Sequence, residues 1–144
     1  MARKFLPYYN VGQSVGNGGS NSPDDVMLVQ YLLSRIGKTP PHPLPPPPMP
    51  LAVNGVATPL LNEWILWFQK CNKAIGEQVL VDGRIDSSKS QGGSFYPPAS
   101  GRTMFFLNTT FRRRFRAEHD ALDLDPQCPM PLRAKFTAES DIYE

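Results

Sequence analysis

The sequence predicts a mainly α protein: a compact three-helix bundle with short strand-like pieces, a polyproline loop and an irregular C-terminal tail. Three stretches carry this prediction, because in each of them apolar residues recur at helical spacing behind a turn of polar residues or glycine. A chain of 144 residues is long enough to bury one core and too short to build two. We therefore expect an arm at residues 1–11, one helical domain at 12–121, and a tail at 122–144 that packs on the domain.

The first predicted helix spans residues 22–37, with the sequence SPDDVMLVQYLLSRIG. Ser22 suits the N-cap, Pro23 suits the first helical position, and two aspartates in the first turn complement the helix dipole. Gly37 is suited to end the helix. Apolar residues at spacings of three, four and three lie on one face and are expected to be buried: Val26, Val29, Leu33 and Ile36.

The chain has 16 prolines, and they concentrate in residues 38–50, KTPPHPLPPPPMP. Proline lacks a backbone N–H and has a fixed φ, so this proline-rich loop should be extended, stiff and exposed, as a polyproline II segment. Two interpretations stay open: a rigid spacer within the domain, or a ligand for an aromatic-lined groove of a partner. His42 lies in this loop without a second candidate ligand nearby, so we predict no metal site there.

The second predicted helix spans residues 59–74, where Thr58 and Pro59 repeat the cap-and-proline start. Trp67 lies off its apolar stripe and, as an exposed ring, is a candidate contact for a sugar or a partner surface. Alternatively, Trp67 faces the aromatic residues of the N-terminal arm and belongs to the core. The stripe that we expect to be buried comprises Leu61, Ile65, Phe68 and either Cys71 or Asn72.

The third predicted helix spans residues 103–120 and carries the one cluster of charge in the chain. Its arginines lie off the apolar stripe and are candidates for binding an anionic polymer, acidic lipid headgroups or an acidic partner. The alternative is a solvated face paired with the acidic residues that follow. The expected apolar stripe comprises Met104, Leu107, Phe111 and Phe115. The candidate partner-binding residues are Arg112, Arg113, Arg114 and Arg116, with Tyr8 and Tyr9 of the arm, which otherwise pack back on the domain.

The connecting segments contain two short apolar runs. Residues 51–56 and 78–81 are expected to form brief strands, each ending near a turn dipeptide. The tail at 122–144 contains several prolines and is expected to wrap the domain without long regular structure.

No arrangement of residues in the sequence points to catalysis. His42 and His119 are the only histidines, neither has a partner at a catalytic spacing, and no HExxH, GxSxG, CxxC or phosphate-binding motif occurs. Cys71 and Cys128 are too few and too far apart to indicate a disulfide scaffold or a metal site. We therefore expect no enzymatic activity, no cofactor and no metal.

Charge and hydropathy narrow the range of partners. The net charge of +2 is too small to indicate a nucleic-acid partner or a membrane surface. No apolar run is long enough for a signal peptide or a membrane span, so we expect synthesis in the cytoplasm and no membrane insertion. A target in the periplasm or cell wall would then require delivery by another route.

Three stretches, in the right order over residues 12–110, resemble the peptidoglycan-binding-like domain family. The first, VGNGGSNSPDDVMLVQYLL, resembles the opening helix of that family. The second joins VNGV to WILWFQ and resembles the family signature DGxxGxxTxxAIxxFQ. The third, VDGRI followed by GRT and LN, resembles the closing DGRVDPGGRT segment that ends in LN.

The resemblance implies a small helical bundle that binds bacterial cell-wall glycan or its stem peptide without reacting with it. We further expect an aromatic side chain, Trp67 or Tyr96, to stack on the ligand. The resemblance also implies which loops face the ligand: by position, the ligand-side loops of the family correspond to Asn54, Gly55, Asp82, Gly83 and Arg84 of this chain.

The alternative function is that of a protein adaptor. Stand-alone members with this opening motif resemble proteins that accompany type VI secretion or contractile injection components. The chain would then be an accessory component of such a system that has kept the fold and lost glycan binding. In that case the proline-rich loop, the aromatic arm and the arginine helix contact a protein partner, or a second copy of the chain in a homo-oligomer.

Overall fold

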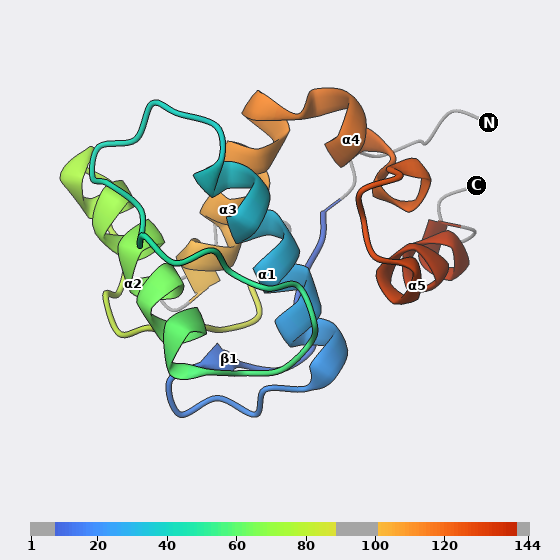
Figure 1. Cartoon of the computed structure of the whole chain (residues 1–144), viewed down its shortest axis with the longest axis horizontal. Coiled ribbons are helices and arrows are strands. Elements are labelled where there is room, and N and C mark those ends of the chain that lie inside the picture. The colour runs from blue at the N-terminus through green and yellow to red at the C-terminus, as the bar shows by residue number, and fades with distance from the viewer. Residues whose placement is uncertain (1–7, 89–100, 141–144) are drawn as a thin grey trace, which may run out of the picture.

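The computed structural model describes residues 8–88 and 101–140, with side chains up to residue 136. Within these residues the chain forms five α-helices, one short 3-10 helix and one two-stranded sheet, so the predicted mainly α class is confirmed (Figure 1). The strands are β1 (Val15–Gly16) and β2 (Arg84–Ile85). The helices are α1 (Pro23–Gly37), α2 (Pro59–Ala74), α3 (Arg102–Arg114), α4 (Arg116–Asp120), the 3-10 helix η2 (Leu122–Leu124) and α5 (Met130–Ser140).

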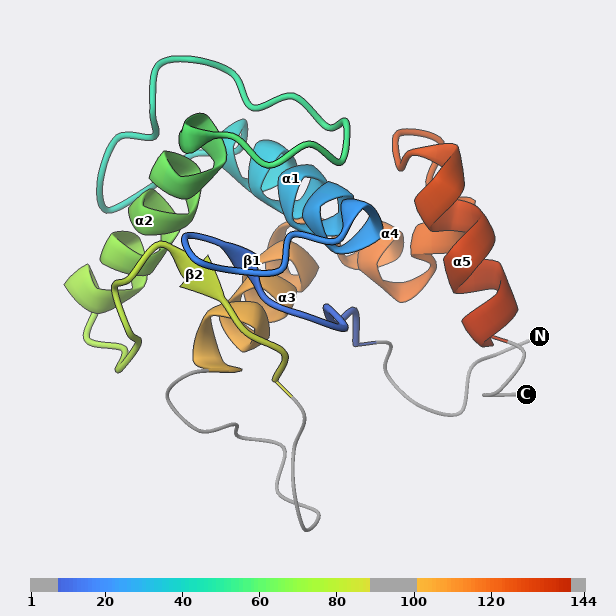
Figure 2. The ribbon, with the colours of Figure 1, turned by 90° about the horizontal axis from the view of Figure 1, so that it is seen from below.

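Helix α1 lies at the centre of the fold. It contacts α2, α3, α5 and β1, and α2 and α3 also contact each other, so the three predicted helical segments share one interior. Seen from below, α2 and α5 lie on opposite sides of α1 (Figure 2). The buried cluster contains the expected apolar stripes, with Phe115 only partly buried, and it extends to Tyr9 near the N-terminus and to Leu132 and Phe136 in α5.

Helix α1 has the predicted bounds, but two of its predicted end signals act differently. Ser22 is the N-cap residue, as predicted, but its side chain makes no capping hydrogen bond. The Asp25 carboxylate accepts hydrogen bonds from the backbone N–H groups of residues 12–13, at 3.0 Å each, and thereby ties the preceding loop to the helix. Gly37 is the last helical residue, and a Cβ there would lie 2.5 Å from Cζ3 of Trp64, so glycine allows α2 to approach α1.

Helix α2 begins and ends where predicted, and Thr58 caps it by accepting a hydrogen bond from the Leu61 N–H at 3.3 Å. We predict that Thr58→Ala lowers the free energy of unfolding by about 1 kcal/mol, because an N-terminal amide of the helix loses its acceptor. Ser22→Ala is the matched control and should be close to neutral, since Ser22 makes no capping bond. Urea denaturation measures both variants, and equal losses would contradict this assignment.

The third predicted helix is interrupted, which corrects the prediction of one helix over residues 103–120. α3 and α4 are separated at Phe115, whose φ is −136° and ψ is 61°. The Phe115 ring packs on Phe111, with centroids 5.0 Å apart, and the guanidinium carbon of Arg35 lies 4.4 Å from its centroid. The break therefore leaves Phe115 in contact with α1 while α4 changes direction across the end of the core.

The C-terminal tail is also more regular than predicted, because α5 forms within it. Leu132 and Phe136 lie four residues apart and are buried, and the Phe136 ring packs on Tyr9 with centroids 4.9 Å apart. Prolines in this segment indicated irregular structure. However, Pro131 lies in the first turn of α5, where a missing N–H is tolerated.

The predicted strands at residues 51–56 and 78–81 are not formed. The two-residue strands β1 and β2 pair antiparallel instead, with Val15 opposite Ile85. Both of these side chains are fully buried. The pairing closes the loop before α1 onto the segment that follows α2. The segment at 51–56 is a loop with Leu51 buried, and it is hydrogen-bonded to Gln30 of α1.

Candidate functional site

The first predicted ligand-side loop, at Asn54 and Gly55, is held by the side chain of Gln30 in α1. Oε1 of Gln30 accepts hydrogen bonds from the backbone N–H groups of Asn54 at 2.9 Å and Gly55 at 2.8 Å. Its Nε2 donates to Oδ1 of Asn54 at 3.2 Å and to the carbonyl oxygen of Val56 at 3.0 Å. Gln30 is buried, so these groups of the loop are satisfied within the chain.

The second predicted loop, at Asp82 and Gly83, is held in the same way by Gln69 in α2. Oε1 of Gln69 accepts from the backbone N–H groups of Asp82 at 3.1 Å and Gly83 at 2.9 Å. Its Nε2 donates to Oδ1 of Asp82 at 3.2 Å and to the carbonyl oxygen of Arg84 at 3.0 Å. A further contact, from Nε2 to Oγ1 of Thr103 at 3.1 Å, joins this loop to α3.

These two units share further details. Oδ1 of Asn54 accepts from the N–H of Val56 at 3.0 Å, and Oδ1 of Asp82 accepts from the N–H of Arg84 at 3.0 Å. The glycine of each turn has a positive φ, 79° in the first and 73° in the second, which is the left-handed region that favours glycine. We call this unit, a helix glutamine that binds an Asn-Gly or Asp-Gly turn, the glutamine clamp.

The two turns were predicted from the sequence, but the glutamines that bind them were not. A signal was present, because Gln30 and Gln69 lie in the stretches VQ and FQ that carry the resemblance, and each is followed by its turn. A buried glutamine must satisfy two donors and an acceptor oxygen, and a tight turn offers matching groups. The structure thus gives the turn residues a role in folding. The Arg84 side chain, in contrast, is 41% exposed, and its Nε lies 3.2 Å from Oδ1 of Asp86 in an ion pair.

Trp67 is buried, so the prediction of an exposed ring is wrong. It is 6% exposed, and it packs edge-to-face on Trp64 with ring centroids 5.4 Å apart. The indole N–H of Trp67 donates to the carbonyl oxygen of Leu44 at 2.9 Å, and that of Trp64 donates to the carbonyl oxygen of Met49 at 3.1 Å. The two tryptophans therefore belong to the core and hold the proline-rich loop, rather than the N-terminal arm.

Tyr8 and Tyr9, the two tyrosines predicted as candidate partner contacts, differ in their burial and hydrogen bonds. Tyr9 is buried, and its hydroxyl donates to the carbonyl oxygen of His119 at 2.6 Å. The half-buried Tyr8 hydroxyl forms a hydrogen bond with the Ser88 hydroxyl, and burial raises the pKa of Tyr8 to about 12. Residues 8 and 9 therefore pack back on the domain, as one of the two interpretations expected. Tyr96 lies outside the described residues.

The arginine cluster divides into three environments. Arg112 pairs with Asp120, as the solvated-face interpretation expected, with Nε and Oδ1 3.7 Å apart. Arg116 is exposed at the start of α4. Arg113 and Arg114 line a pocket formed by residues of α1, α2, α3 and the proline-rich loop.

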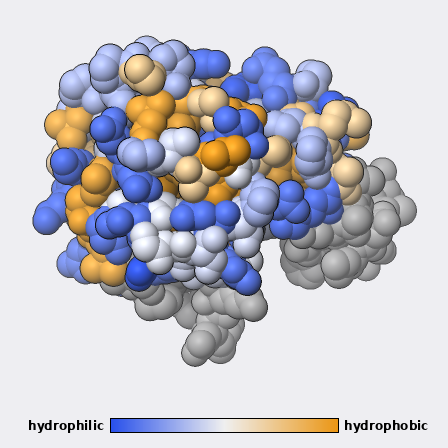
Figure 3. Space-filling view, turned by 60° about the horizontal axis from the view of Figure 1, so that its bottom comes forward, coloured by the Kyte–Doolittle hydropathy of each residue, from blue (hydrophilic) through white to orange (hydrophobic). Residues whose placement is uncertain are grey.

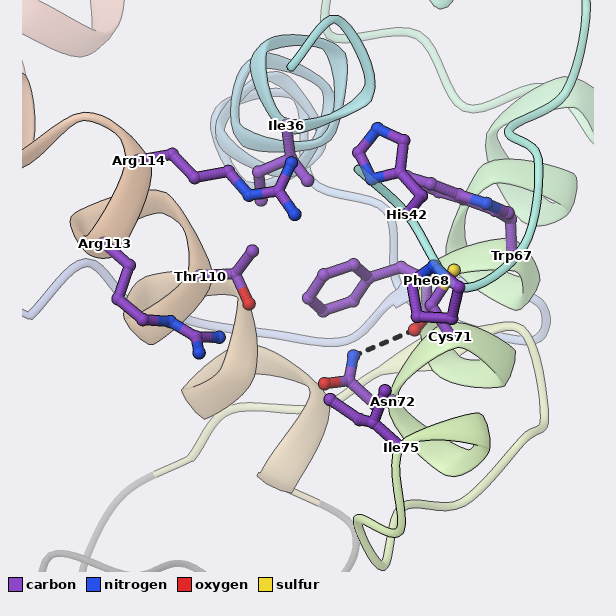
Figure 4. Close-up of a pocket in the computed structure, with 11 residues that line it drawn as sticks. Ile36, His42, Trp67, Phe68, Cys71, Asn72, Ile75, Thr110, Arg113 and Arg114 are labelled. Carbon is purple, nitrogen blue, oxygen red and sulfur yellow. Dashed lines mark hydrogen bonds between the residues drawn. The ribbon is translucent and has the colours of Figure 1, made fainter. Parts of the chain in front are cut away.

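This pocket has a volume of about 60 Å³. Figure 4 shows Arg113 and Arg114 extending from α3 toward it, with Thr110 between them and Phe68 across from Thr110. Nη2 of Arg114 donates to the carbonyl oxygen of Pro41 at 2.8 Å, whereas its Nη1 is buried and has no hydrogen-bond partner in the described part of the chain. The other lining residues are Ile36, His42, Pro43, Trp67, Cys71, Asn72 and Ile75.

The pocket carries positive charge. Burial lowers the pKa of His42 and raises the pKa of the Cys71 thiol, so both side chains are neutral at pH 7. Burial, and then the adjacent positive charge of Arg113, lower the pKa of Arg114. None of the described residues that line the pocket is acidic, so the two guanidinium groups lack a carboxylate partner within it.

Residues 8–88 and 101–140 contain neither a candidate membrane span nor a candidate metal site. No helix there has both the length and the apolar character needed to cross a membrane. No three or more His, Cys, Asp or Glu side chains in these ranges are grouped so that they could hold a metal ion. Cys71 and Cys128 are both buried and free.

The candidate site thus consists of two glutamine clamps, a tryptophan-bound proline-rich loop and a positively charged pocket. No protein-family model matches the chain, and neither a curated protein nor a solved structure matches it significantly.

Proposed function

We propose that this chain is a non-catalytic recognition module of the peptidoglycan-binding type, whose ligand is bacterial cell-wall glycan or its stem peptide. The observation that supports this most is the duplicated glutamine clamp. It joins Gln30 to Asn54-Gly55 and Gln69 to Asp82-Gly83, which are residues of the stretches that carry the sequence resemblance. A chance likeness of short stretches gives no reason for the same hydrogen bonds to form twice.

We place the ligand at the pocket beside Arg113 and Arg114 rather than at the two turns. The backbone N–H groups of the turns already donate to the clamp glutamines. The ring of Trp67 is buried beneath the proline-rich loop, which leaves little of its face for stacking on a sugar. The two arginines, in contrast, offer charged donors beside an apolar wall.

Co-sedimentation with insoluble peptidoglycan tests this function. We expect the purified chain to pellet with the cell-wall material at low ionic strength and to be released as salt is added, because salt screens charges over about 10 Å at 0.1 M. Soluble cell-wall fragments should compete with the pellet for the chain. A chain that stays in the supernatant even at low salt would contradict the proposal.

An adaptor function is the second candidate, and the proline-rich loop favours it. Two indole N–H groups fix the loop at Leu44 and Met49, so it is presented as one rigid, largely exposed segment. Leu44 is 36% exposed and Met49 is 63% exposed. On the face shown in Figure 3, apolar residues form several patches separated by polar ones. A partner that recognises a preformed proline-rich segment would therefore bind the loop rather than a broad apolar surface.

The adaptor candidate is tested by co-expression with spike and sheath components of a contractile injection or type VI secretion system. If it holds, the double variant Leu44→Ser and Met49→Ser should no longer co-purify with the component that binds the chain. Leu124→Ser is the matched control, because Leu124 is 74% exposed in η2, outside the loop. Loss of binding in both variants, or in neither, would count against the loop as the contact.

A further inference from the structure

The pocket beside Arg113 and Arg114 has the features of a site for an anionic group. Arg114 is fixed in place, because its Nη2 donates to the carbonyl oxygen of Pro41 at 2.8 Å. Its other terminal nitrogen, Nη1, is buried without a hydrogen-bond partner among the described residues. A buried charged donor without an acceptor is costly, and an oxyanion would supply the missing acceptor.

A second arginine, Arg113, adds positive charge to the pocket and strengthens the case for a bound anion. Arg113 immediately precedes Arg114 on α3, and Figure 4 shows its guanidinium directed toward the same pocket. No ion pair is formed by either residue in the described part of the chain, although Arg112 beside them is paired with Asp120. An anion between the two guanidinium groups would reduce their mutual repulsion and accept charge-assisted hydrogen bonds from both.

The size and walls of the pocket indicate which kind of anion fits. Its volume of about 60 Å³ is several times the roughly 10–15 Å³ that one water molecule needs, so it accommodates a small head group. Ile36, Phe68 and Ile75 provide an apolar wall. A carboxylate that carries a small apolar substituent matches both the charged side and the apolar side of this pocket.

We propose that the pocket binds a free peptide C-terminus, with its carboxylate between Arg113 and Arg114 and a small apolar terminal side chain against Phe68. This rests on the proposed function, since it names the part of a cell-wall stem peptide that the module would recognise. Thr110, which lies between the two arginines, offers a hydroxyl donor to the same carboxylate.

Titration calorimetry of the full chain with a matched pair of peptides tests the site. The probes are N-acetyl-alanyl-alanine, as the L,L and D,D isomers, and the same peptides with a C-terminal amide. We expect the acids to bind at least about tenfold more tightly than the amides, because the amide loses charge-assisted hydrogen bonds. Equal affinity for acid and amide, or no binding of either acid, would overturn the proposal.

Variants locate the site. Arg113→Gln should weaken binding of the acid by about tenfold, and we expect it to fold normally because Arg113 is exposed. Arg114→Gln should do the same, although it also removes the bond to Pro41. Arg116→Gln is the matched control, because Arg116 is exposed and does not line the pocket. Equal loss in Arg113→Gln and Arg116→Gln would place the binding elsewhere and overturn the proposal.

Two further measurements test whether the pocket prefers a carboxylate to other anions, and whether the carboxylate site and the proposed function stand independently. Inorganic phosphate that binds more tightly than the peptide acids would overturn the assignment to a carboxylate. Retention on cell-wall material that Arg113→Gln leaves unchanged would also overturn it, and would place cell-wall binding on another surface of the chain. Binding of the peptide acid by a chain that cell-wall material does not retain would support the carboxylate site and remove the proposed function.

Discussion

Gln69→Ala is expected to lower the free energy of unfolding by about 3 kcal/mol, the largest effect we predict for a single polar side chain. Gln69 is 1% exposed, and its amide bonds to the turn at residues 82–84 and to Thr103 in α3. Alanine leaves the N–H of the buried Gly83 without its acceptor. The loss is therefore that of an unsatisfied buried donor as well as of several hydrogen bonds.

Urea denaturation followed by circular dichroism measures this effect. Lys70→Ala is the matched control, because Lys70 is the exposed neighbour of Gln69 in the same helix and should change stability by no more than about 0.5 kcal/mol. Gln30→Ala should behave like Gln69→Ala, since it removes the equivalent clamp. If Gln69→Ala and Lys70→Ala proved equally stable, the clamp would not hold the fold as we describe.

Acidification is expected to destabilise the protein through His119, by about 3 kcal/mol between pH 6.5 and pH 4. Burial lowers the pKa of His119 from 6.5 to about 4, with a smaller opposing effect of the Asp120 carboxylate and a smaller lowering effect of Arg112. In this interval the unfolded chain binds a proton that the folded chain does not. The contribution is therefore fully present above pH 6.5 and is lost as the pH falls toward 4.

The surroundings of His119 explain why its neutral form is preferred. Oδ1 of Asn108 lies 3.1 Å from Nε2 of His119 and already accepts from the N–H of Tyr9 at 2.9 Å. The amide nitrogen of Asn108 donates to the carbonyl oxygens of Tyr9 and Met104, so Oδ1 is the acceptor and Nε2–H of the imidazole is the donor. The other ring nitrogen is buried without a partner among the described residues, and protonation there would bury an unpaired charge.

His119→Phe isolates this contribution, because phenylalanine keeps a ring against Tyr9 and cannot titrate. We expect the unfolding free energy of the wild type to fall more steeply than that of the variant, by about 1.4 kcal/mol per pH unit between pH 6.5 and pH 4. Carboxylates that titrate in the same range affect both proteins equally and cancel in the difference. Parallel curves for the two proteins would show that His119 is not held neutral by burial.

The sequence was a reliable guide to helices that local chemistry defines. α2 begins at the Thr58 cap and Pro59, and its apolar stripe is buried, because caps and spacing act over a few residues. The break at Phe115 was not predicted, since its ring satisfies the apolar spacing and its contact with Arg35 joins it to a distant helix, α1. Contacts between distant segments decide such features, and a single sequence does not display them.

The candidate site was harder to predict for the same reason. Trp67 lies off the apolar stripe, which indicated exposure, but residues more than twenty positions earlier return to cover it and accept its N–H. Arg113 and Arg114 were predicted as a charged face without any indication that they line a pocket with α1 and α2. The turns at Asn54 and Asp82 were located correctly, whereas the glutamines that bind them required the helices to be placed in space.

The proposed function places recognition of the bacterial cell wall at the pocket beside Arg113 and Arg114. The most direct measurement is the fraction of chain that pellets with increasing amounts of purified cell-wall material, for the wild type, Arg113→Gln and Arg116→Gln. We expect wild type and Arg116→Gln to pellet alike, while Arg113→Gln needs about tenfold more material for the same fraction. Three superimposable curves, or no pelleting of the wild type, would contradict it.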